Sequence, residues 1–246
     1  MKIIASIEAR MKSSRLPGKV LKKICNKPVL LHIVERLKKS KHINDIVIAT
    51  SLSKDDDVIE KFALKNNISY YRGSEEDVLK RLLGAHEYMK TDIVVEITGD
   101  SPLIDWEVVD KTIEMYLNNN VDYVSNTLKR SHPIGVRSQV FGINILKECE
   151  NLAYLEKDRE HVTTFICKND NNKYKLLNYS APKHLDYPRM RLTLDYQEDY
   201  DLINKIYEHF YPEDKFCLFD VIKFLNSNPD ISSINKNCKQ RYKEGA

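Results

Sequence analysis

The sequence of 246 residues lacks the features that mark several large classes of protein. Its five cysteines are odd in number and no two of them have CxxC spacing, so we expect neither a disulfide framework nor a zinc site. No apolar run approaches the roughly 20 residues that span a membrane, and the apolar patch after Lys2 is too short for a signal peptide. These absences predict a cytoplasmic protein that does not bind membranes.

An excess of charge of one sign is also missing. Charged residues make up 30% of the chain but the formal net charge is +3, which argues against non-specific nucleic-acid binding. Two common phosphate-binding fingerprints are absent as well, since no GxGxxG follows the first predicted strand and GxxxxGK[ST] occurs nowhere. A dinucleotide-dependent dehydrogenase and an ordinary ATPase are therefore disfavoured.

The sequence does contain a basic loop directly after a short apolar strand. Residues 3–7 are mostly β-branched and too few for a helix, which predicts a buried strand. The loop that follows contains four cations, Arg10, Lys12, Arg15 and Lys19. Cations so close together repel one another unless an anion lies among them, and a polyphosphate suits arginine, lysine and serine side chains. A solvated basic turn is the alternative, but a loop after the first strand of an α/β sheet lies where such sheets bind ligands.

Apolar residues repeat with strand and helix periods in alternation along the rest of the chain. We expect further strands at about residues 43–49, 68–71, 92–97, 121–125, 139–143, 174–179 and 189–194. We expect helices at about residues 29–37, after 53, and at 74–89, 105–118, 146–155, 158–167, 200–206 and 218–225. The alternation predicts one α/β domain over residues 1–235, followed by a basic tail, 236–246, that is frayed or contacts a partner.

Five segments carry a resemblance to a known family. They are EARMKSSRLPGK at residues 8–19, RGSEEDVL at 72–79, ITGDSPLID at 97–105, REHVT at 159–163 and RLTLD at 191–195. In this order they resemble the cytidylyltransferase family that includes the acylneuraminate and KDO cytidylyltransferases, most closely the branch named for spore coat polysaccharide biosynthesis protein F. The resemblance implies an α/β, three-layer Rossmann-like nucleotidyltransferase fold with a mostly parallel central sheet, and a homodimer.

The activity implied by the resemblance is transfer of CMP from CTP to a sugar acid or another anionic acceptor, with Mg²⁺ as cofactor and release of pyrophosphate. Such a transfer depends on positioning and electrostatics rather than on covalent help from the protein. Three alternatives stay open. The chain could use another NTP or a sugar 1-phosphate, could be a non-catalytic nucleotide-binding relative, or could be a glycosyltransferase that consumes a nucleotide sugar.

The residues that we expect to bind the nucleotide lie in the first two segments of the resemblance. They are Ala9, Arg10, Ser14, Arg15, Lys19, Arg72, Ser74 and Asp77. We assign catalytic roles to Arg15, Lys19 and Asp100, and we place Lys19 nearest the α- or β-phosphate, where negative charge grows in the transition state. The segment at residues 72–77 has an alternative interpretation as a helix start capped by Ser74, with Arg72 pairing locally.

Asp100 and Asp195 are the predicted Mg²⁺ ligands. Gly99 permits a tight bend and Pro102 ends strand pairing, so Asp100 is expected to project from the carboxyl end of its strand. Asp195 follows the alternating segment 189–194, which predicts that both carboxylates lie at one edge of the sheet. Mg²⁺ usually takes one or two carboxylates together with phosphate oxygens. An aspartate after a strand is otherwise a turn residue or a helix cap.

The residues that we expect to bind the acceptor are His132, Arg137, Gln139, Glu160, His161 and Arg191. The stretch 126–138 has little apolar content, which predicts a mobile substrate loop. The branch commonly has glutamine at position 8, glycine at position 12 and acids at positions 134, 137 and 139. Because Arg137 replaces an acid, we expect an anionic acceptor. His161 has a structural alternative, since a helical histidine is often part of the packing.

Overall fold

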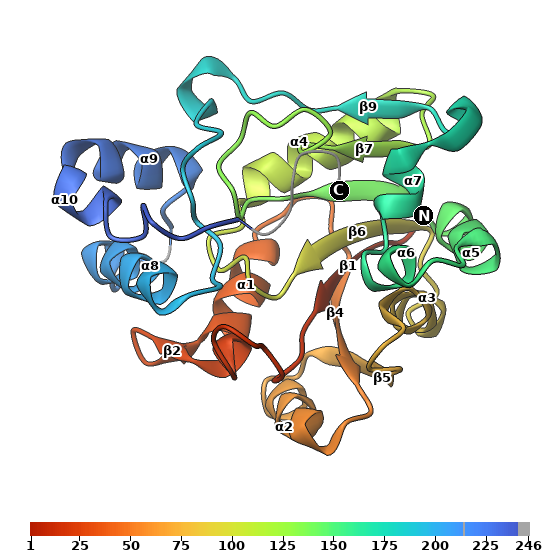
Figure 1. Cartoon of the computed structure of the whole chain (residues 1–246), viewed down its shortest axis with the longest axis horizontal. Helices are drawn as coiled ribbons and strands as arrows, with labels where there is room; N and C mark the ends of the chain where they lie inside the picture. Colours follow the sequence, from red (N-terminus) through yellow and green to blue (C-terminus); the bar gives the residue numbers. More distant parts are fainter. Residues whose placement is uncertain (214, 241–246) are drawn as a thin grey trace.

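The computed structural model of the chain describes residues 1–213 and 215–240 (Figure 1). Within them, seven strands form one sheet in the order β5–β4–β1–β6–β8–β7–β9. The strands are β1 (Ile3–Glu8), β4 (Asp45–Ser51), β5 (Ser69–Gly73), β6 (Ile93–Thr98), β7 (Tyr123–Ser125), β8 (Gln139–Gly142) and β9 (Leu176–Asn178). β8 is antiparallel to both of its neighbours, and the other neighbouring pairs are parallel. This confirms the predicted α/β fold with a mostly parallel central sheet.

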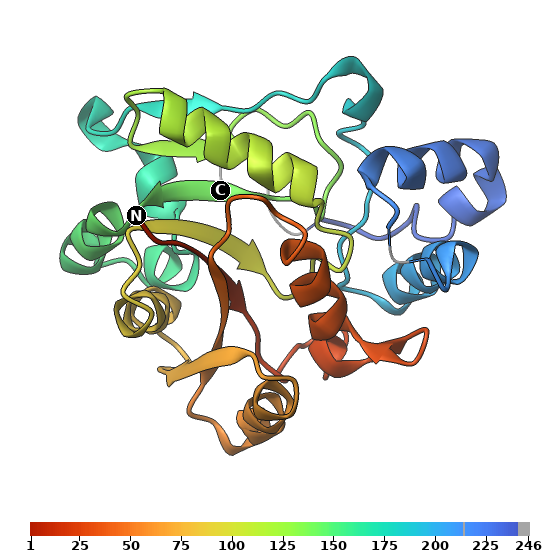
Figure 2. The same cartoon turned by 180° about the vertical axis from the view of Figure 1, so that it is seen from behind.

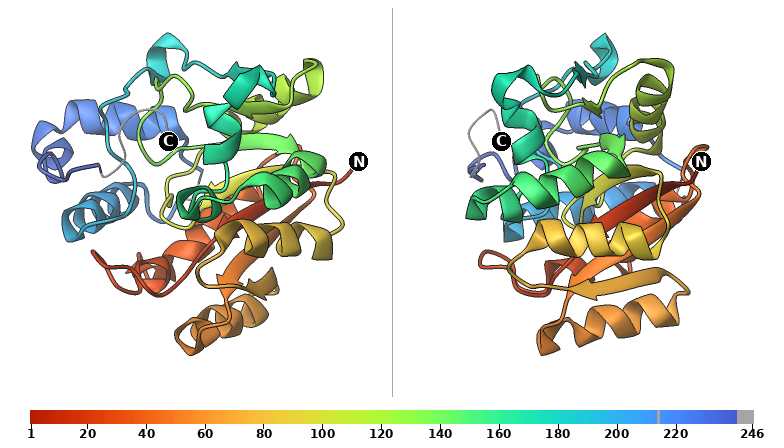
Figure 3. Two further views of the ribbon diagram at one scale, coloured as in Figure 1. Left: turned by 45° about the vertical axis from the view of Figure 1, so that its right-hand side comes forward. Right: turned by 90° about the vertical axis from the view of Figure 1, so that its right-hand side faces the viewer.

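Helices cover both faces of the sheet. On one face lie α1 (Val29–Leu37), α2 (Asp57–Lys65) and α4 (Trp106–Asn118), and on the other lie α3 (Val78–Tyr88) and α5 (Ile143–Leu152). Figure 2 shows α1 and α4 in front of the sheet, and Figure 3 shows α3 and α5 side by side. Strand β1 is buried on both faces, because Ile3, Ala5 and Ile7 join the core on the α1 side while Ile4 joins the core on the α3 side. The predicted three-layer arrangement is confirmed.

Further helices, several of them short, complete the described structure. They are α6 (Glu156–Glu160), α7 (Thr164–Lys168), α8 (Gln197–Phe210), α9 (Leu218–Ser227), α10 (Pro229–Ser232), and the 3₁₀ helices η1 (Lys19–Leu21), η2 (Lys54–Asp56), η3 (Asp170–Asn172) and η4 (Lys183–Leu185). In Figure 1, α8, α9 and α10 lie beyond the end of the sheet toward which β6 points. Across the described residues, no helix combines the length and the apolar character needed to cross a membrane.

The strand predicted at residues 189–194 is wrong. Within the described chain this segment forms one isolated bridge, between Ile134 and Arg191, with the Leu192 N–H donating to the Ile134 carbonyl at 2.7 Å. Pairing ends there because Gly135 has a φ of +103°, which turns its chain away. A side chain at Gly135 would be impossible, since its Cβ would lie 2.4 Å from the backbone of the facing segment.

Other predictions differ in their bounds or miss an element. A hairpin of β2 (Lys23–Ile24) and β3 (Lys27–Pro28) precedes α1, with a turn in which Cys25 and Asn26 both have positive φ, 45° and 66°. Helix α3 is capped by Asp77, whose side chain accepts the N–H of Lys80, and not by Ser74. The helices predicted at 146–155 and 158–167 are the three helices α5, α6 and α7.

Candidate active site

Backbone hydrogen bonds fix the basic loop at its start and at its end. The Ala9 N–H donates to the Ala49 carbonyl at 3.2 Å, and the Gly18 N–H donates to the Met11 carbonyl at 2.9 Å. The Met11 N–H donates to Oδ1 of Asp56 at 2.6 Å. Asp56 is the second of three consecutive acids, residues 55–57, at a helix start. Its bond to the Met11 N–H holds the basic loop, a contact that the sequence alone does not indicate. Ala9 is among the residues predicted to bind the nucleotide; its N–H is used by β4, and its nucleotide contact stays a prediction.

Asp100 is placed by the close approach of two strand ends. The Gly99 N–H donates to the Glu8 carbonyl at 2.9 Å, and a Cβ at Gly99 would lie 2.5 Å from that oxygen, so glycine is required. The next residue, Asp100, accepts the Thr98 hydroxyl at 2.6 Å and, through its own carbonyl, the Leu194 N–H at 2.9 Å. The second bond brings the segment that carries Asp195 against the end of β6.

Asp100 and Asp195 converge on one ammonium group. Nζ of Lys19 lies 3.1 Å from Oδ2 of Asp100 and 2.9 Å from Oδ1 of Asp195. Nη2 of Arg15 lies 2.8 Å from the same oxygen of Asp195, and the Arg15 guanidinium stacks 4.9 Å from the centre of the Tyr196 ring. The structure thus brings together Arg15, Lys19 and both predicted metal ligands, as the sequence predicted. Arg10 and Ser14 lie exposed on the same loop.

Opposite charges keep these groups ionised. Burial raises the pKa of Asp100, but the Lys19 charge and the Thr98 hydroxyl outweigh burial, so the pKa lies below its usual value. Burial likewise lowers the pKa of Lys19, but Asp100 and Asp195 outweigh it, so the pKa lies above its usual value. Both carboxylates therefore face a cation at neutral pH.

The carboxylates of Asp100 and Asp195 and the Thr98 hydroxyl beside Asp100 form a set of oxygen ligands that fits Mg²⁺. In the described chain no cluster of three or more His, Cys, Asp or Glu side chains has the geometry to hold a metal. A site built on Asp100 and Asp195 therefore depends on phosphate oxygens to complete it, which is how Mg²⁺ usually binds beside nucleotides.

Arg191, predicted to bind the acceptor, lies behind Asp195. Its exposed fraction is 7%, and its guanidinium bonds to Asp195 and to Asp199, the third residue of α8. The structure thus places Arg191 behind a predicted metal ligand and away from the open surface, and its contact with an acceptor stays a prediction. Asp199 was not predicted from the sequence, although an acid in the first turn, three residues after the N-cap Tyr196, is a signal for a helix start.

Arg72 makes local bonds through its whole guanidinium. Nε donates to the Ser51 carbonyl at 2.9 Å and Nη2 to the Ser53 carbonyl at 2.8 Å, while Nη1 lies 2.6 Å from Glu60 and 2.8 Å from Asp57. The structural alternative for Arg72 is therefore the one observed, and its predicted nucleotide contact remains a prediction.

Ser74 and Asp77 are likewise engaged at the start of α3. The Ser74 hydroxyl accepts the Asp77 N–H at 3.0 Å, and Asp77 lies 2.6 Å from Nη2 of Arg159, which also pairs with Glu150 at 2.6 Å. This network joins α3 to the segment that follows α5. Because Arg159 is held in this network, the next two residues, Glu160 and His161, lie beside the basic loop.

Glu160 and His161 lie beside the basic loop. Nη2 of Arg10 is 4.0 Å from Oε1 of Glu160, and the two side chains are 43% and 49% exposed. His161 is half-buried, and burial lowers its pKa below the usual value. Predicted phosphate-binding and acceptor-binding residues thus share one surface.

A polar cluster lies under α3, on the opposite face of the sheet from α1. Glu8 and Glu96 project from adjacent strands, with Glu8 opposite Thr98 in the register, and their carboxyl groups hydrogen-bond each other. Burial and the charge of Glu96 raise the pKa of Glu8 well above its usual value, and burial raises that of Glu96 although Arg137 opposes it. Glu96 was missed because it interrupts an otherwise apolar strand.

Arg137 and Gln139 belong to this cluster. Nη2 of Arg137 donates to Oε1 of Gln139 at 2.9 Å and to the Thr163 hydroxyl at 3.2 Å, and Gln139 also accepts the Tyr123 hydroxyl. Gln139 is fully buried. Arg137 thus lies where its charge acts on the interior carboxyls Glu8 and Glu96, and its predicted contact with an anionic acceptor stays a prediction.

The loop at residues 126–138 is hydrogen-bonded and partly buried, which differs from the mobile loop that was predicted. The Asn126 amide donates to the Val136 carbonyl at 2.8 Å and accepts the Ser138 N–H at 2.9 Å. His132 is 2% exposed, its ring lies 4.9 Å from that of Tyr179, and burial lowers its pKa to about 4. His132 is thus a neutral, packed side chain at neutral pH.

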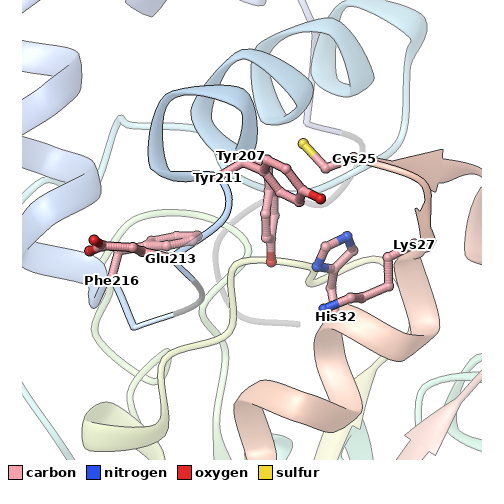
Figure 4. A pocket seen from close by; sticks show the side chains of 7 residues that line it. All are labelled: Cys25, Lys27, His32, Tyr207, Tyr211, Glu213 and Phe216. Atoms are coloured by element: carbon pink, nitrogen blue, oxygen red, sulfur yellow. The ribbon is translucent and has the colours of Figure 1, made fainter.

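Two hollows lie away from the two carboxylates. One, of about 10 Å³, holds no more than a water molecule and lies between α1 and the end of α8 (Figure 4). It is lined by Cys25, Lys27, His32, Tyr207, Tyr211, Glu213 and Phe216. The other, of about 490 Å³, is a shallow surface along β5. Among the described residues, neither lining includes Lys19, Asp100 or Asp195.

Comparison with known proteins identifies the family. The sequence profile of the family described as Cytidylyltransferase matches residues 4–218. The chain is 38% identical over 245 residues to "Uncharacterized protein MJ1063" of Methanocaldococcus jannaschii, which covers 99% of each chain. It is 34% identical over 236 residues to spore coat polysaccharide biosynthesis protein SpsF of Bacillus subtilis, which covers 94% of this chain and 97% of that one.

A third relative and a solved structure agree with this. The 3-deoxy-manno-octulosonate cytidylyltransferase of Thermodesulfovibrio yellowstonii is 34% identical over 153 residues, 60% of this chain and 58% of that one. A cytidylyltransferase structure from Leptospira borgpetersenii superposes with a TM-score of 0.88 at 31% identity, covering 99% of this chain and 100% of that one. This chain belongs to the cytidylyltransferase family.

Proposed function

We propose that the chain is a Mg²⁺-dependent cytidylyltransferase that transfers CMP from CTP to a sugar acid and releases pyrophosphate. One observation carries the proposal. Lys19 meets Asp100 and Asp195, 81 and 176 residues further along the chain, at distances of 3.1 and 2.9 Å. Two carboxylates on one side of a basic loop suit a nucleotide triphosphate together with its metal ion.

The residues of the basic loop bind and orient the triphosphate. Arg15 offers a planar fork for phosphate oxygens, and Lys19 offers a point charge that is itself fixed by two carboxylates. Asp100 and Asp195 would hold Mg²⁺, which when bound supplies neutralisation of phosphate charge. Exposed Arg10 adds a further cation at the same surface.

The transfer itself is a displacement at the α-phosphorus. An acceptor hydroxyl oxygen forms a bond to that phosphorus, the bond from the phosphorus to the bridging oxygen breaks, and pyrophosphate leaves with the electron pair. The proton of the hydroxyl passes to solvent. Lys19 and Arg15 stabilise the charge that develops on the departing oxygens, so their removal lowers kcat more than it weakens CTP binding.

A sugar acid is the acceptor that we propose. Support comes from the relative whose name specifies 3-deoxy-manno-octulosonate, and from the exposed Arg10 of the basic loop, which lies beside Glu160 and His161. A negatively charged acceptor approaching this surface meets cations on the loop side.

The test is pyrophosphate release with each of the four NTPs against a panel of sugar acids, neutral sugars and sugar 1-phosphates. We expect release with CTP and a sugar acid in the presence of Mg²⁺. Release with another NTP and a sugar 1-phosphate would replace this proposal with that activity. No release with any pair, together with tight CTP binding, would make the chain a non-catalytic relative.

A further inference from the structure

Asp199 is a buried carboxylate, and both of its oxygens accept hydrogen bonds. It is 0% exposed, and within the described chain it accepts five hydrogen bonds. Two come from Arg191, through Nε and Nη2 at 2.8 Å each. Two come from the N–H groups of Asp195 and Tyr196 at 3.0 Å each, and one from the Asn235 amide at 2.8 Å. A carboxylate with both oxygens so fully used is held in one orientation.

Asp199 competes with Asp195 for the same cation. Nη2 of Arg191 lies 2.8 Å from Oδ2 of Asp199 and 3.1 Å from Oδ2 of Asp195. The two-pronged bond to Asp199 balances most of the Arg191 charge. Without it, the Arg191 guanidinium would have Asp195 as its nearest carboxylate.

Charges around the predicted metal ligands are balanced when Asp199 is included. Among the described residues in this network, three cations (Arg15, Lys19 and Arg191) bond to three carboxylates (Asp100, Asp195 and Asp199). Removal of the Asp199 charge would leave three positive charges against two negative ones. Such a site attracts a metal cation less and a triphosphate more.

The segment after α10 closes the network from behind. The amide of Asn235, 5% exposed, donates to Oδ1 of Asp199 at 2.8 Å and to the Arg191 carbonyl at 3.0 Å. Oε1 of Gln240 accepts Nη1 of Arg191, and the Tyr196 hydroxyl donates to the Lys239 carbonyl at 3.4 Å. Residues 236–240, expected as part of a frayed tail, thus pack on the candidate active site, and 241–246 lie outside the described residues.

We propose that Asp199 and Asn235 are positioning residues that hold Arg191 away from a closer, two-pronged pairing with Asp195, so that the Asp195 carboxylate stays available to the metal ion bound with the triphosphate. The inference rests on the proposed function in one respect, the role of Asp195 as a metal ligand. It goes beyond it by giving the C-terminal segment a part in metal binding. The other reading of Asp199, a helix cap that only stabilises α8, predicts a different result.

The test compares D199N with D201N. The amide keeps the size of the Asp199 side chain and removes its charge, while Asp201 is an exposed residue of α8 whose side chain bonds to Gln197, so its variant changes net charge equally without touching the network. Mn²⁺ binding is measured by electron paramagnetic resonance with saturating CTP, and CTP binding is measured by calorimetry in EDTA.

For D199N we expect Mn²⁺ binding to weaken by about tenfold, in the range found for residues that orient metal ligands. We expect CTP binding without metal to stay equal or to become tighter, because the site has gained positive charge. D201N should leave both constants unchanged. N235A should shift Mn²⁺ binding in the same direction by a smaller factor, about threefold, and it serves if D199N does not fold.

A cap that only stabilises α8 would lower the melting temperature of D199N and leave Mn²⁺ binding unchanged, and that result overturns the inference. Parallel weakening of Mn²⁺ and metal-free CTP binding overturns it as well. If the wild-type protein binds CTP but neither binds Mn²⁺ nor releases pyrophosphate, the proposed function fails together with the inference. Wild-type activity with unchanged Mn²⁺ binding in both D199N and N235A rejects the inference alone.

Discussion

Two pairs of carboxyl groups lie near the carboxyl ends of the parallel strands, and the groups that surround the two pairs differ. In the lysine-bridged pair, Asp100 and Asp195, a Lys19 ammonium lies between the two groups, and the pKa of Asp100 falls below its usual value. In the proton-sharing pair, Glu8 and Glu96, the two groups hydrogen-bond each other, and burial raises the pKa of both. The cation between the groups, and not the residue type, decides which pair is available to a metal ion.

The largest expected effect comes from breaking the lysine-bridged pair. D100N removes the charge that follows Gly99 and that Lys19 faces. We expect pyrophosphate release with CTP and acceptor to fall about 10²- to 10³-fold, as when a preorganised electrostatic contact to a transition state is lost. Fold stability should change little, because Asp195 still pairs with Lys19. D92N, an exposed change at the start of the chain segment leading into β6, is the control. Wild-type turnover in D100N would remove Asp100 from the site.

The next effect comes from removing the cation of the proton-sharing pair. R137M leaves Glu8 and Glu96 without the positive charge that partly offsets their burial. Loss of a cation that offsets buried acidic groups costs about 1–3 kcal/mol, which in a chain of this size lowers the melting temperature by several °C. The melting temperature at pH 7 is the measurement.

A double variant sharpens this prediction. Adding E96Q to R137M removes the uncompensated carboxyl, so we expect part of the lost melting temperature to return. If instead R137M melts like the wild type and raises the KM of the acceptor far more than that of CTP, Arg137 contacts the acceptor, as the sequence alone suggested.

The smallest effect is a pH dependence. The pKa of Glu8 is raised in the folded protein, so the unfolded chain releases this proton at lower pH, and stability falls as pH rises from the usual pKa of a glutamate toward the raised one. E8Q mimics the protonated form and removes this loss. We expect equal melting temperatures near pH 4 and a variant more stable by a few °C at pH 8, about the effect of 1 kcal/mol. A difference that is constant between pH 4 and pH 8 would contradict proton sharing.

Sequence periodicity predicted the layers and the convergence of Asp100 with Asp195, but the strand from which the position of Asp195 was predicted does not form. The carboxyl ends of parallel strands share an edge, and this places Asp100. Asp195 does not follow a strand, since its segment makes one bridge at Arg191. It reaches the same point because the Leu194 N–H bonds to the Asp100 carbonyl, a contact that leaves no periodic trace in the sequence.

Residues that act through long-range side-chain contacts were the ones that could not be predicted. Asn235 bonds to a carbonyl 44 residues earlier, and nothing in the local pattern of either segment indicates it. Glu8 and Arg137 stood out as unusual for the family branch, but only the sheet register shows that they approach the same carboxyl, Glu96. The basic loop was predicted well because its charge density is local.

The most direct test of the account is a crystal structure of the protein with a non-hydrolysable CTP analogue and Mn²⁺, with the metal located by anomalous scattering. We expect one Mn²⁺ in contact with carboxylate oxygens of Asp100 and Asp195 at about 2.1 Å, close to the distance typical of Mg²⁺, with Arg15 and Lys19 against the triphosphate. A metal held elsewhere, or a triphosphate bound away from Lys19, would contradict it.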